Sequence, residues 1–171
     1  QALGRHPGLA AAYRVRSQAL FWKVQTSAGA ADLLASRQQS LADAEEAIRL
    51  GDPAWAARGN ARWQLGDEEG ALLDFAKALE VEPRDALTWN HRGILRQKRN
   101  DSAGAVQDFG RAVELAPGFG RAWGNRAWAN AGLGDNSAAA ADARKALEFG
   151  SADTAWRSQL ESLLRMVGEG K

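Results

Sequence analysis

Tryptophan and alanine recur along the chain with a period of 34 residues. The recurring positions are Trp55, Trp89 and Trp123, then Ala71, Ala105 and Ala139, then Ala78, Ala112 and Ala146. A polar pair divides each period into two apolar stretches, and these pairs are Gly66-Asp67, Asn100-Asp101 and Gly134-Asp135. Gly and Asn tolerate positive φ, and Asp can cap the helix that follows. The pattern therefore predicts stacked helix pairs, none of which buries its apolar face alone.

The period divides most of the chain into three repeats, 52–85, 86–119 and 120–153. Pro83 and Pro117 stand between repeats, where proline ends the preceding helix. After the third repeat, apolar residues return at helical spacing in Trp156, Leu160, Leu163, Leu164 and Val167. This spacing predicts a final helix over 154–167 that caps the open end of the stack.

The first part of the chain follows the same register with an irregularity. Tyr13 takes the place of the tryptophan, so we expect an irregular repeat over 8–51. The distance from Tyr13 to the small residues of the second helix is too long, which indicates an insertion at about 23–38. Gly29 and its neighbours predict a turn there, between two overlong helices.

The residues before this repeat have the spacing of a repeat's end. Ala2 precedes Pro7 by the five residues that separate Ala78 from Pro83. We therefore expect that residues 1–7 end a preceding repeat. On this interpretation the chain is a single domain over its whole length and a fragment of a longer protein.

The first two periods contain the full pattern Trp-x-x-x-Gly, Ala-x-x-x-Phe, Ala and Pro. The matching residues are Trp55, Gly59, Ala71, Phe75, Ala78 and Pro83, then Trp89, Gly93, Ala105, Phe109, Ala112 and Pro117. The third period has Trp123, Ala127, Ala139, Ala143 and Ala146, with Ser151 in the place of proline. This pattern resembles the tetratricopeptide repeat (TPR) family. The resemblance implies an all-α, superhelical solenoid of stacked antiparallel helix pairs with a concave ligand face and a C-terminal capping helix.

The chain departs from the family pattern three residues after each opening aromatic, where arginine replaces leucine. These residues are Arg16, Arg58, Arg92 and Arg126, and four aspartates recur at one place in the second helices, Asp43, Asp74, Asp108 and Asp142. We expect each Arg to meet an Asp between packed helices, partly buried and bidentate. A pair present in every unit is a structural device, because catalysis needs one asymmetric site.

Composition narrows the function further. The 171 residues carry a formal net charge of +1, which argues against a nucleic-acid or anionic-membrane surface. No apolar run has the length of a membrane span. With no cysteine and only two histidines, His6 and His91, we expect no metal, no cofactor and no catalytic residue. Cytoplasm is the default location, although an exported or periplasmic domain would have the same composition.

In this family the first helix of each pair lines the groove, one, five, eight and nine residues after the opening aromatic. The resemblance places there Arg14, Gln18, Phe21, Trp22, Asn60, Trp63, Gln64, Asn90, Ile94, Gln97, Lys98 and Trp128, with the basic Arg121 beside them. Amide side chains can bond an extended backbone in both directions, and aromatic rings supply buried area. Trp63 and Trp128 could instead pack against a neighbouring repeat.

One known use of the family is a clamp of lysine, asparagine and arginine that grips a chaperone's C-terminal carboxylate. This chain has Ala56 in place of the first lysine, and His91 and Asn125 in place of the second asparagine and the arginine. Only Asn60 and Arg121 match. The sequence therefore argues against binding of a chaperone tail, while Lys98 in the groove favours an acidic peptide.

These observations predict a non-catalytic interaction module that holds an extended segment or a helix of a partner protein. Two other classes stay open. The chain could be a regulatory or sensing appendage of a larger bacterial enzyme such as a serine/threonine kinase. Its Ala-, Arg- and Trp-rich composition resembles the repeat tails that follow some bacterial kinase domains. It could also be a spacer or a self-association module that pairs through its end helices, by way of Trp156 or the open N-terminal end.

Overall fold

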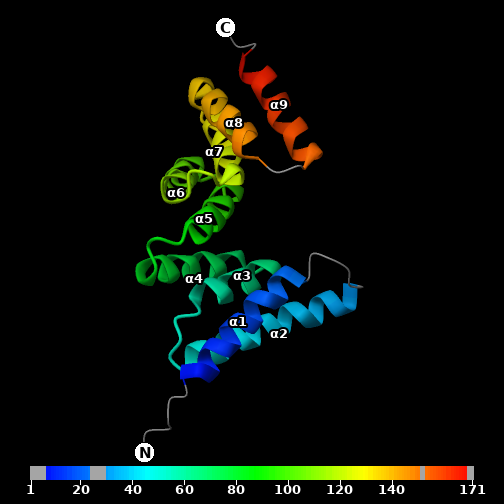
Figure 1. Cartoon of the computed structure of the whole chain (residues 1–171), viewed down its shortest axis with the longest axis vertical. Coiled ribbons are helices and arrows are strands. Elements are labelled where there is room, and N and C mark those ends of the chain that lie inside the picture. The colour runs from blue at the N-terminus through cyan, green and yellow to red at the C-terminus, as the bar shows by residue number, and fades with distance from the viewer. Residues whose placement is uncertain (1–6, 24–29, 151–152, 169–171) are drawn as a thin grey trace, which may run out of the picture. The chain divides into compact units, whose positions relative to one another are not determined.

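The computed structural model describes residues 7–23, 30–150 and 153–168, and this part of the chain is built from helices and short connections (Figure 1). The helices are α1 (Pro7–Lys23), α2 (Ala30–Arg49), α3 (Trp55–Gln64), α4 (Glu68–Val81), α5 (Ala86–Lys98), α6 (Ser102–Leu115), α7 (Gly120–Gly132), α8 (Asn136–Phe149) and α9 (Thr154–Gly168). The expected end of a preceding repeat falls mostly outside the described residues, as does the turn expected at Gly29.

The chain divides into two compact units, residues 1–83 and residues 84–171. In the first unit α1 packs on α2, α2 on α3 and α3 on α4, and the two first helices α1 and α3 also touch. In the second unit the same succession runs from α5 to α9, and α7 also touches both α5 and α9. Each unit is therefore a stack of neighbouring helices. That the whole chain is a single domain stays a prediction.

The turns within the helix pairs have the backbone that the sequence predicted. Gly66, Asn100 and Gly134 have φ of +90°, +64° and +81°. The aspartate after each one caps the next helix, because its carboxylate accepts a hydrogen bond from a backbone N–H in the first turn at 2.9 Å. These caps are Asp67 on α4, Asp101 on α6 and Asp135 on α8.

Close approach of the two helices in a pair depends on glycine. A Cβ added at Gly59 would lie 2.7 Å from the ring of Phe75, and a Cβ at Gly93 would lie 2.7 Å from the ring of Phe109. Both rings are fully buried. In the third pair Ala127 stands where the other pairs have glycine, and Ala143 stands where they have phenylalanine. Both alanines are buried. A larger side chain on the first helix is thus matched by a smaller one on the second helix, which keeps the contact close-packed.

The last helix packs onto the second unit through its apolar stripe. Trp156, Leu160, Leu163 and Val167 of α9 are buried in one cluster with the small residues of α7 and α8. Gly124 of α7 leaves room for the indole of Trp156, since a Cβ there would come within 2.6 Å of it. Self-association through Trp156 would therefore require α9 to leave its own core.

The insertion in the first repeat lengthens the helices of that pair. Helix α1 has 17 residues and α2 has 20, whereas α3 has 10 and α4 has 14. The two long helices lie side by side in the first unit (Figure 1). Asp32, in the first turn of α2, suits the positive end of the helix dipole.

Candidate functional site

The predicted arginine–aspartate pairs are confirmed in all four helix pairs. In each one the Nε atom donates to Oδ2 and the Nη2 atom donates to Oδ1, over 2.5 to 2.9 Å. The pairs are Arg16–Asp43, Arg58–Asp74, Arg92–Asp108 and Arg126–Asp142. Each bridge joins the first helix to the second helix of its own pair, so its role is to fix their packing.

Besides its bidentate arginine, each buried aspartate has one more polar side chain as a partner. Asp74 accepts from Arg62 and Asp142 accepts from Asn130, each over 3.0 Å, while Asp108 lies 3.0 Å from Nη1 of Arg96. Burial raises the pKa of Asp43, but hydrogen bonds from Arg16 and Gln39 and the charge of Arg16 outweigh it, so its pKa lies below the usual value. Carboxylates with filled acceptor sites are suited to structure rather than to proton transfer.

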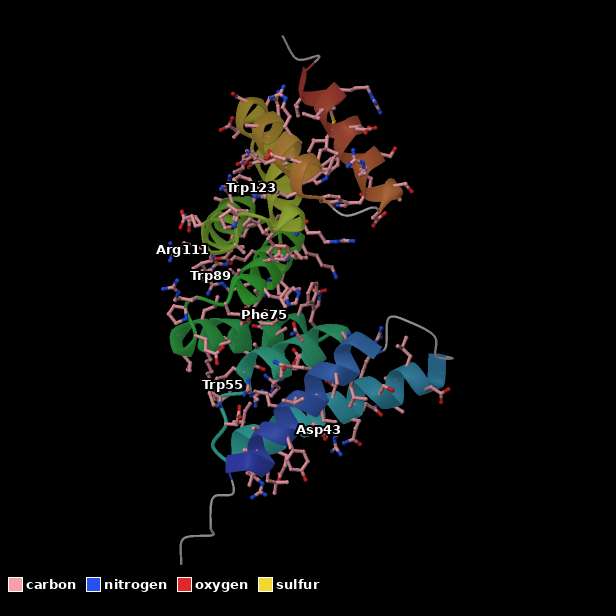
Figure 2. The ribbon with its side chains drawn as sticks, viewed as in Figure 1. Asp43, Trp55, Phe75, Trp89, Arg111 and Trp123 are labelled. Carbon is pink, nitrogen blue, oxygen red and sulfur yellow. The ribbon has the colours of Figure 1, made fainter. Side chains whose placement is uncertain are left out.

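The same arginines stack on the opening aromatic residues. The Cζ atoms of Arg58, Arg92 and Arg126 lie 4.9, 4.7 and 4.7 Å from the ring centroids of the tryptophans three residues earlier. Trp55, Trp89 and Trp123 (labelled in Figure 2) are half-buried. A guanidinium on the face of an indole is a favourable cation–π contact.

In the first unit, the predicted partner-binding residues have different surroundings. Arg14 lies 3.0 Å from a carboxylate oxygen of Asp52, which ties α1 to the loop before α3. Gln18 of α1 is exposed, and Asn60 and Trp63 of α3 are half-buried. The side chains of Phe21 and Trp22 lie outside the described residues.

Helix α3 carries two amide side chains one turn apart, Asn60 and Gln64. Asn60 Oδ1 and Gln64 Oε1 are both buried, and within the described part of the chain neither accepts a hydrogen bond. A buried acceptor without a donor costs free energy. These two oxygens have unused acceptor capacity in this arrangement of the chain.

In the second unit a hydrogen bond connects the first helices of successive repeats. Asn125 Nδ2 on α7 donates to Asn90 Oδ1 on α5 over 2.9 Å. Asn90 is buried by this arrangement of the chain, and Gln97 on the same helix is half-buried, whereas Lys98 is exposed. Ile94 packs against the buried cluster of Ala105, Phe109 and Ala129. Asn90 and Ile94 thus offer less free surface than Gln97 and Lys98.

Arg121 and Trp128, both on α7, contribute to the packing of the second unit near its last helices. Arg121 Nη2 lies 3.3 Å from Asp153 Oδ2, and its guanidinium lies 5.8 Å from the ring of Trp156. Trp128 is half-buried against the cluster formed by α7, α8 and α9. Both residues have a packing role here, and their role toward a partner stays a prediction.

Two residues at this surface stand apart from the predicted set. Asn125 lies two residues after Trp123, outside the positions that the family pattern assigns to the groove, yet it contacts Asn90. The sequence could have indicated this contact, because Asn125 follows Asn90 by 35 residues, which is one repeat period plus one residue. His91 is buried on α5, and burial lowers its pKa to about 4.

Metal and membrane chemistry have no visible basis in the described residues. Among them, no group of three or more His, Asp or Glu side chains is placed to hold a metal ion. None of the described helices combines the length and the apolar character that crossing a bilayer demands.

Comparison with known proteins connects this geometry to one family. The model of the tetratricopeptide repeat matches residues 52–85 and 120–149. A search of curated proteins found no match to this chain.

Solved structures with similar folds include the first TPR of Spaghetti (RPAP3) bound to the HSP90 peptide SRMEEVD. It has a TM-score of 0.61 and 19% identity, and the match covers 67% of this chain and 90% of that one. MamA matches with a TM-score of 0.62 and 19% identity over 69% of this chain and 74% of its own. The MamA RS-1 ArsTM double mutant matches with a TM-score of 0.72 and 20% identity over 94% and 89%.

The all-α fold, the paired helices and the recurring small and aromatic positions agree with these matches. Residues 52–85 and 120–149 therefore match the tetratricopeptide repeat, and the chain has the fold of solved structures that include a TPR domain.

Proposed function

We propose that this chain is a non-catalytic protein-interaction module that binds an extended segment or a helix of a partner protein along its first helices. The observation that carries the proposal is the hydrogen bond from Asn125 to Asn90. It joins α5 to α7 in the second unit, and the half-buried Gln97 and the exposed Lys98 lie about two turns further along α5. Such a surface can bond a peptide backbone and attract an acidic side chain.

The first unit offers a second surface of the same kind. Asn60 and Gln64 share one face of α3, and α3 touches α1, which carries the exposed Gln18. The buried oxygens of Asn60 and Gln64 would gain donors if the two amides turned toward a bound backbone. No intramolecular hydrogen bond at these oxygens would be lost in exchange, which favours binding.

The similar structure of Spaghetti (RPAP3) was solved with an HSP90 peptide, so this fold can hold a peptide. The present chain has Ala56 where a chaperone clamp needs lysine, and Arg121 is already paired with Asp153. We therefore propose a partner that is recognised through its backbone and an acidic side chain rather than through a terminal carboxylate.

The proposal can be tested with selected peptides. Dodecamer peptides displayed on phage are selected on the intact chain, and the best binder is measured by isothermal titration against variants. Gln97→Ala should weaken a peptide that binds the second unit, and Asn60→Ala a peptide that binds the first unit, each about three- to tenfold, the worth of one neutral hydrogen bond. Because both side chains are half-buried at most, we expect melting temperatures close to wild type. Trp128→Ala is unsuitable, since its packing on the α7–α9 core makes a loss of stability certain to interfere.

The matched control is Gln107→Ala, the same chemical change on an exposed position of the second helix α6. It should leave peptide affinity unchanged. Binding that is lost in Gln107→Ala but kept in both first-helix variants would overturn the proposal. Recovery of no binding peptide from the library would also count against it.

A further inference from the structure

Arg37 differs from the other half-buried arginines of the first unit. Arg14, Arg58 and Arg62 each form an ion pair with an aspartate, at 3.0, 2.7 and 3.0 Å. Arg37 on α2 is also half-buried, and its Nε atom is fully buried. Within the described part of the chain this N–H donates to no acceptor, and the guanidinium pairs with no carboxylate. A buried cation that lacks an anion is costly, so the side chain is suited to a negatively charged group from outside.

The register of α2 against α3 brings Arg37 to the level of Gln64. Ala44 of α2 and Ala57 of α3 lie in one buried cluster, and the short connection between these neighbouring helices makes them antiparallel. Arg37 precedes Ala44 by seven residues, and Gln64 follows Ala57 by seven residues. Seven residues are about two helical turns, so the same faces of the two helices are involved. The contact between the alanines therefore continues to Arg37 and Gln64.

The second unit contains the same contact, made there by small residues. Counted from the paired aspartate, Ser102 of α6 corresponds to Arg37, and counted from the opening tryptophan, Gly132 of α7 corresponds to Gln64. A Cβ added at Gly132 would lie 3.8 Å from Ser102 Oγ, so these two positions touch. In the first unit this place is taken by two long polar side chains, one a cationic donor and one an amide.

The unused hydrogen-bonding atoms near this contact are of both kinds. Arg37 Nε is a buried donor, whereas Gln64 Oε1 and Asn60 Oδ1, one turn apart on α3, are buried acceptors to which no described residue donates. A ligand that satisfies all three must donate N–H groups to the amides and bring a negative charge to the guanidinium. A peptide does both, because its backbone supplies N–H groups and an acidic side chain supplies a carboxylate that arginine can bind bidentately.

We propose that Arg37 binds the side-chain carboxylate of an aspartate or glutamate in a partner segment whose backbone N–H groups donate to Asn60 and Gln64. This role rests on the proposed function, since it names what the first unit recognises in the segment it binds. Arg37 lies on a second helix, outside the groove positions that the family pattern assigns to first helices. It makes the first unit selective for an acidic segment, because an uncharged side chain in the same place would leave the guanidinium without its anion.

The test uses selected dodecamers whose binding is weakened by Asn60→Ala, synthesised with an amidated C-terminus so that carboxylates come from side chains alone. Each aspartate or glutamate of such a peptide is replaced in turn by asparagine or glutamine. Both forms are titrated against the original chain and against Arg37→Met. On the original chain one replacement should weaken binding about ten- to a hundredfold, the worth of hydrogen bonds to a charged group. On Arg37→Met the same replacement should change the affinity less than about twofold.

The matched control is Arg49→Met on the same helix, whose exposed guanidinium is already paired with Glu46. It should leave the preference for the acidic peptide unchanged, whereas Arg37→Lys, which keeps the charge, should retain part of that preference. Arg37→Met should not lower the melting temperature. A clear decrease would show that the guanidinium has a structural partner, and the proposed role would be wrong.

Two outcomes of the titrations separate this role from the proposed function. If the amide-bearing peptide loses as much affinity on Arg37→Met as on the original chain, Arg37 does not bind the carboxylate, although the chain still binds peptides. A selection in which no binder depends on Asn60 rejects the role of Arg37 as well, while binders that depend on Gln97 leave the proposed function in place. A library that yields no binder at all counts against both.

Discussion

Arg92 and Asp108 are held together by two parallel hydrogen bonds, 2.9 Å from Nε to Oδ2 and 2.7 Å from Nη2 to Oδ1. The guanidinium lies 4.7 Å from the ring centroid of Trp89 on its own helix. Asp108 is 1% exposed and also ion-pairs with Arg96. One buried carboxylate thus holds two cations of α5 against α6, and loss of that carboxylate removes the bidentate partner of Arg92 and leaves Arg96 with Asp101 at 3.8 Å.

We expect Asp108→Leu to be much more harmful than removal of the whole pair. The single variant leaves the largely buried Arg92 without its carboxylate, and should cost about 3 kcal/mol of unfolding free energy. The double variant Arg92→Leu/Asp108→Leu should recover part of this loss. Urea denaturation followed by circular dichroism measures both. Arg111→Leu, which breaks an exposed pair with Glu114, serves as the control and should cost less than about 1 kcal/mol. Equal losses in Asp108→Leu and Arg111→Leu would contradict the assignment.

The sequence predicted the internal geometry of the repeats well, because that geometry depends on register. A residue three places after the opening aromatic and an aspartate sixteen places further on meet in the same way in the pairs at Arg58, Arg92 and Arg126. The caps were predictable for the same reason, since each is a local turn followed by Asp. Even in the longer first repeat, Arg16 reaches Asp43, because the insertion lengthens two helices outside their contact.

The surface was harder to predict, since its residues depend on neighbours outside the period. Arg121 lies over the ring of Trp156 of α9, and Trp128 packs against the cluster that α7, α8 and α9 form together. The 34-residue period could not show these contacts, because Trp156 is one residue out of the repeat register. Likewise, the half-buried tryptophans stack on the arginines that replace leucine three residues later.

Gly93→Ala is predicted to destabilise the chain although alanine favours helices. The added Cβ would lie 2.7 Å from the buried ring of Phe109, and overpacking of a close contact costs about 1–3 kcal/mol. The third repeat has alanine at both corresponding positions, Ala127 and Ala143, so a smaller residue in place of Phe109 should make room for the added Cβ. Adding Phe109→Ala should therefore cost less than the sum of the two single changes, in a double-mutant cycle by thermal denaturation.

The control for this cycle is Gly110→Ala, a mid-helix glycine of α6 whose added Cβ would meet only Arg126 Nη1, at 3.7 Å. It should stabilise the chain by up to about 1 kcal/mol through helix propensity. Strictly additive changes at Gly93 and Phe109 would show that the two residues do not share one packing contact.

Asp135→Ala tests the helix caps. Asp135 accepts a hydrogen bond from the backbone N–H of Ala138 at 2.9 Å, and its loss should cost about 1 kcal/mol. Asp135→Asn keeps the acceptor oxygen and removes the charge, so it should cost only a few tenths of that value. Circular dichroism during urea denaturation separates the two. A charge effect alone would make both variants equally harmful.

Protonation of His91 should destabilise the chain in mild acid. Burial lowers the pKa of His91 from 6.5 to about 4, while the charge of Asp85 acts in the opposite direction. As the pH falls, the unfolded chain therefore binds a proton at His91 before the folded chain does. The free energy of unfolding should decrease progressively from pH 6.5 to about pH 4, by up to about 3 kcal/mol in total. The melting temperature, measured from pH 8 to pH 4, should fall most steeply in this window. His91→Leu removes the titrating group, so its curve should be flatter between pH 6.5 and 4 whatever its stability at pH 8. Parallel curves for the two chains would show that His91 does not cause the loss.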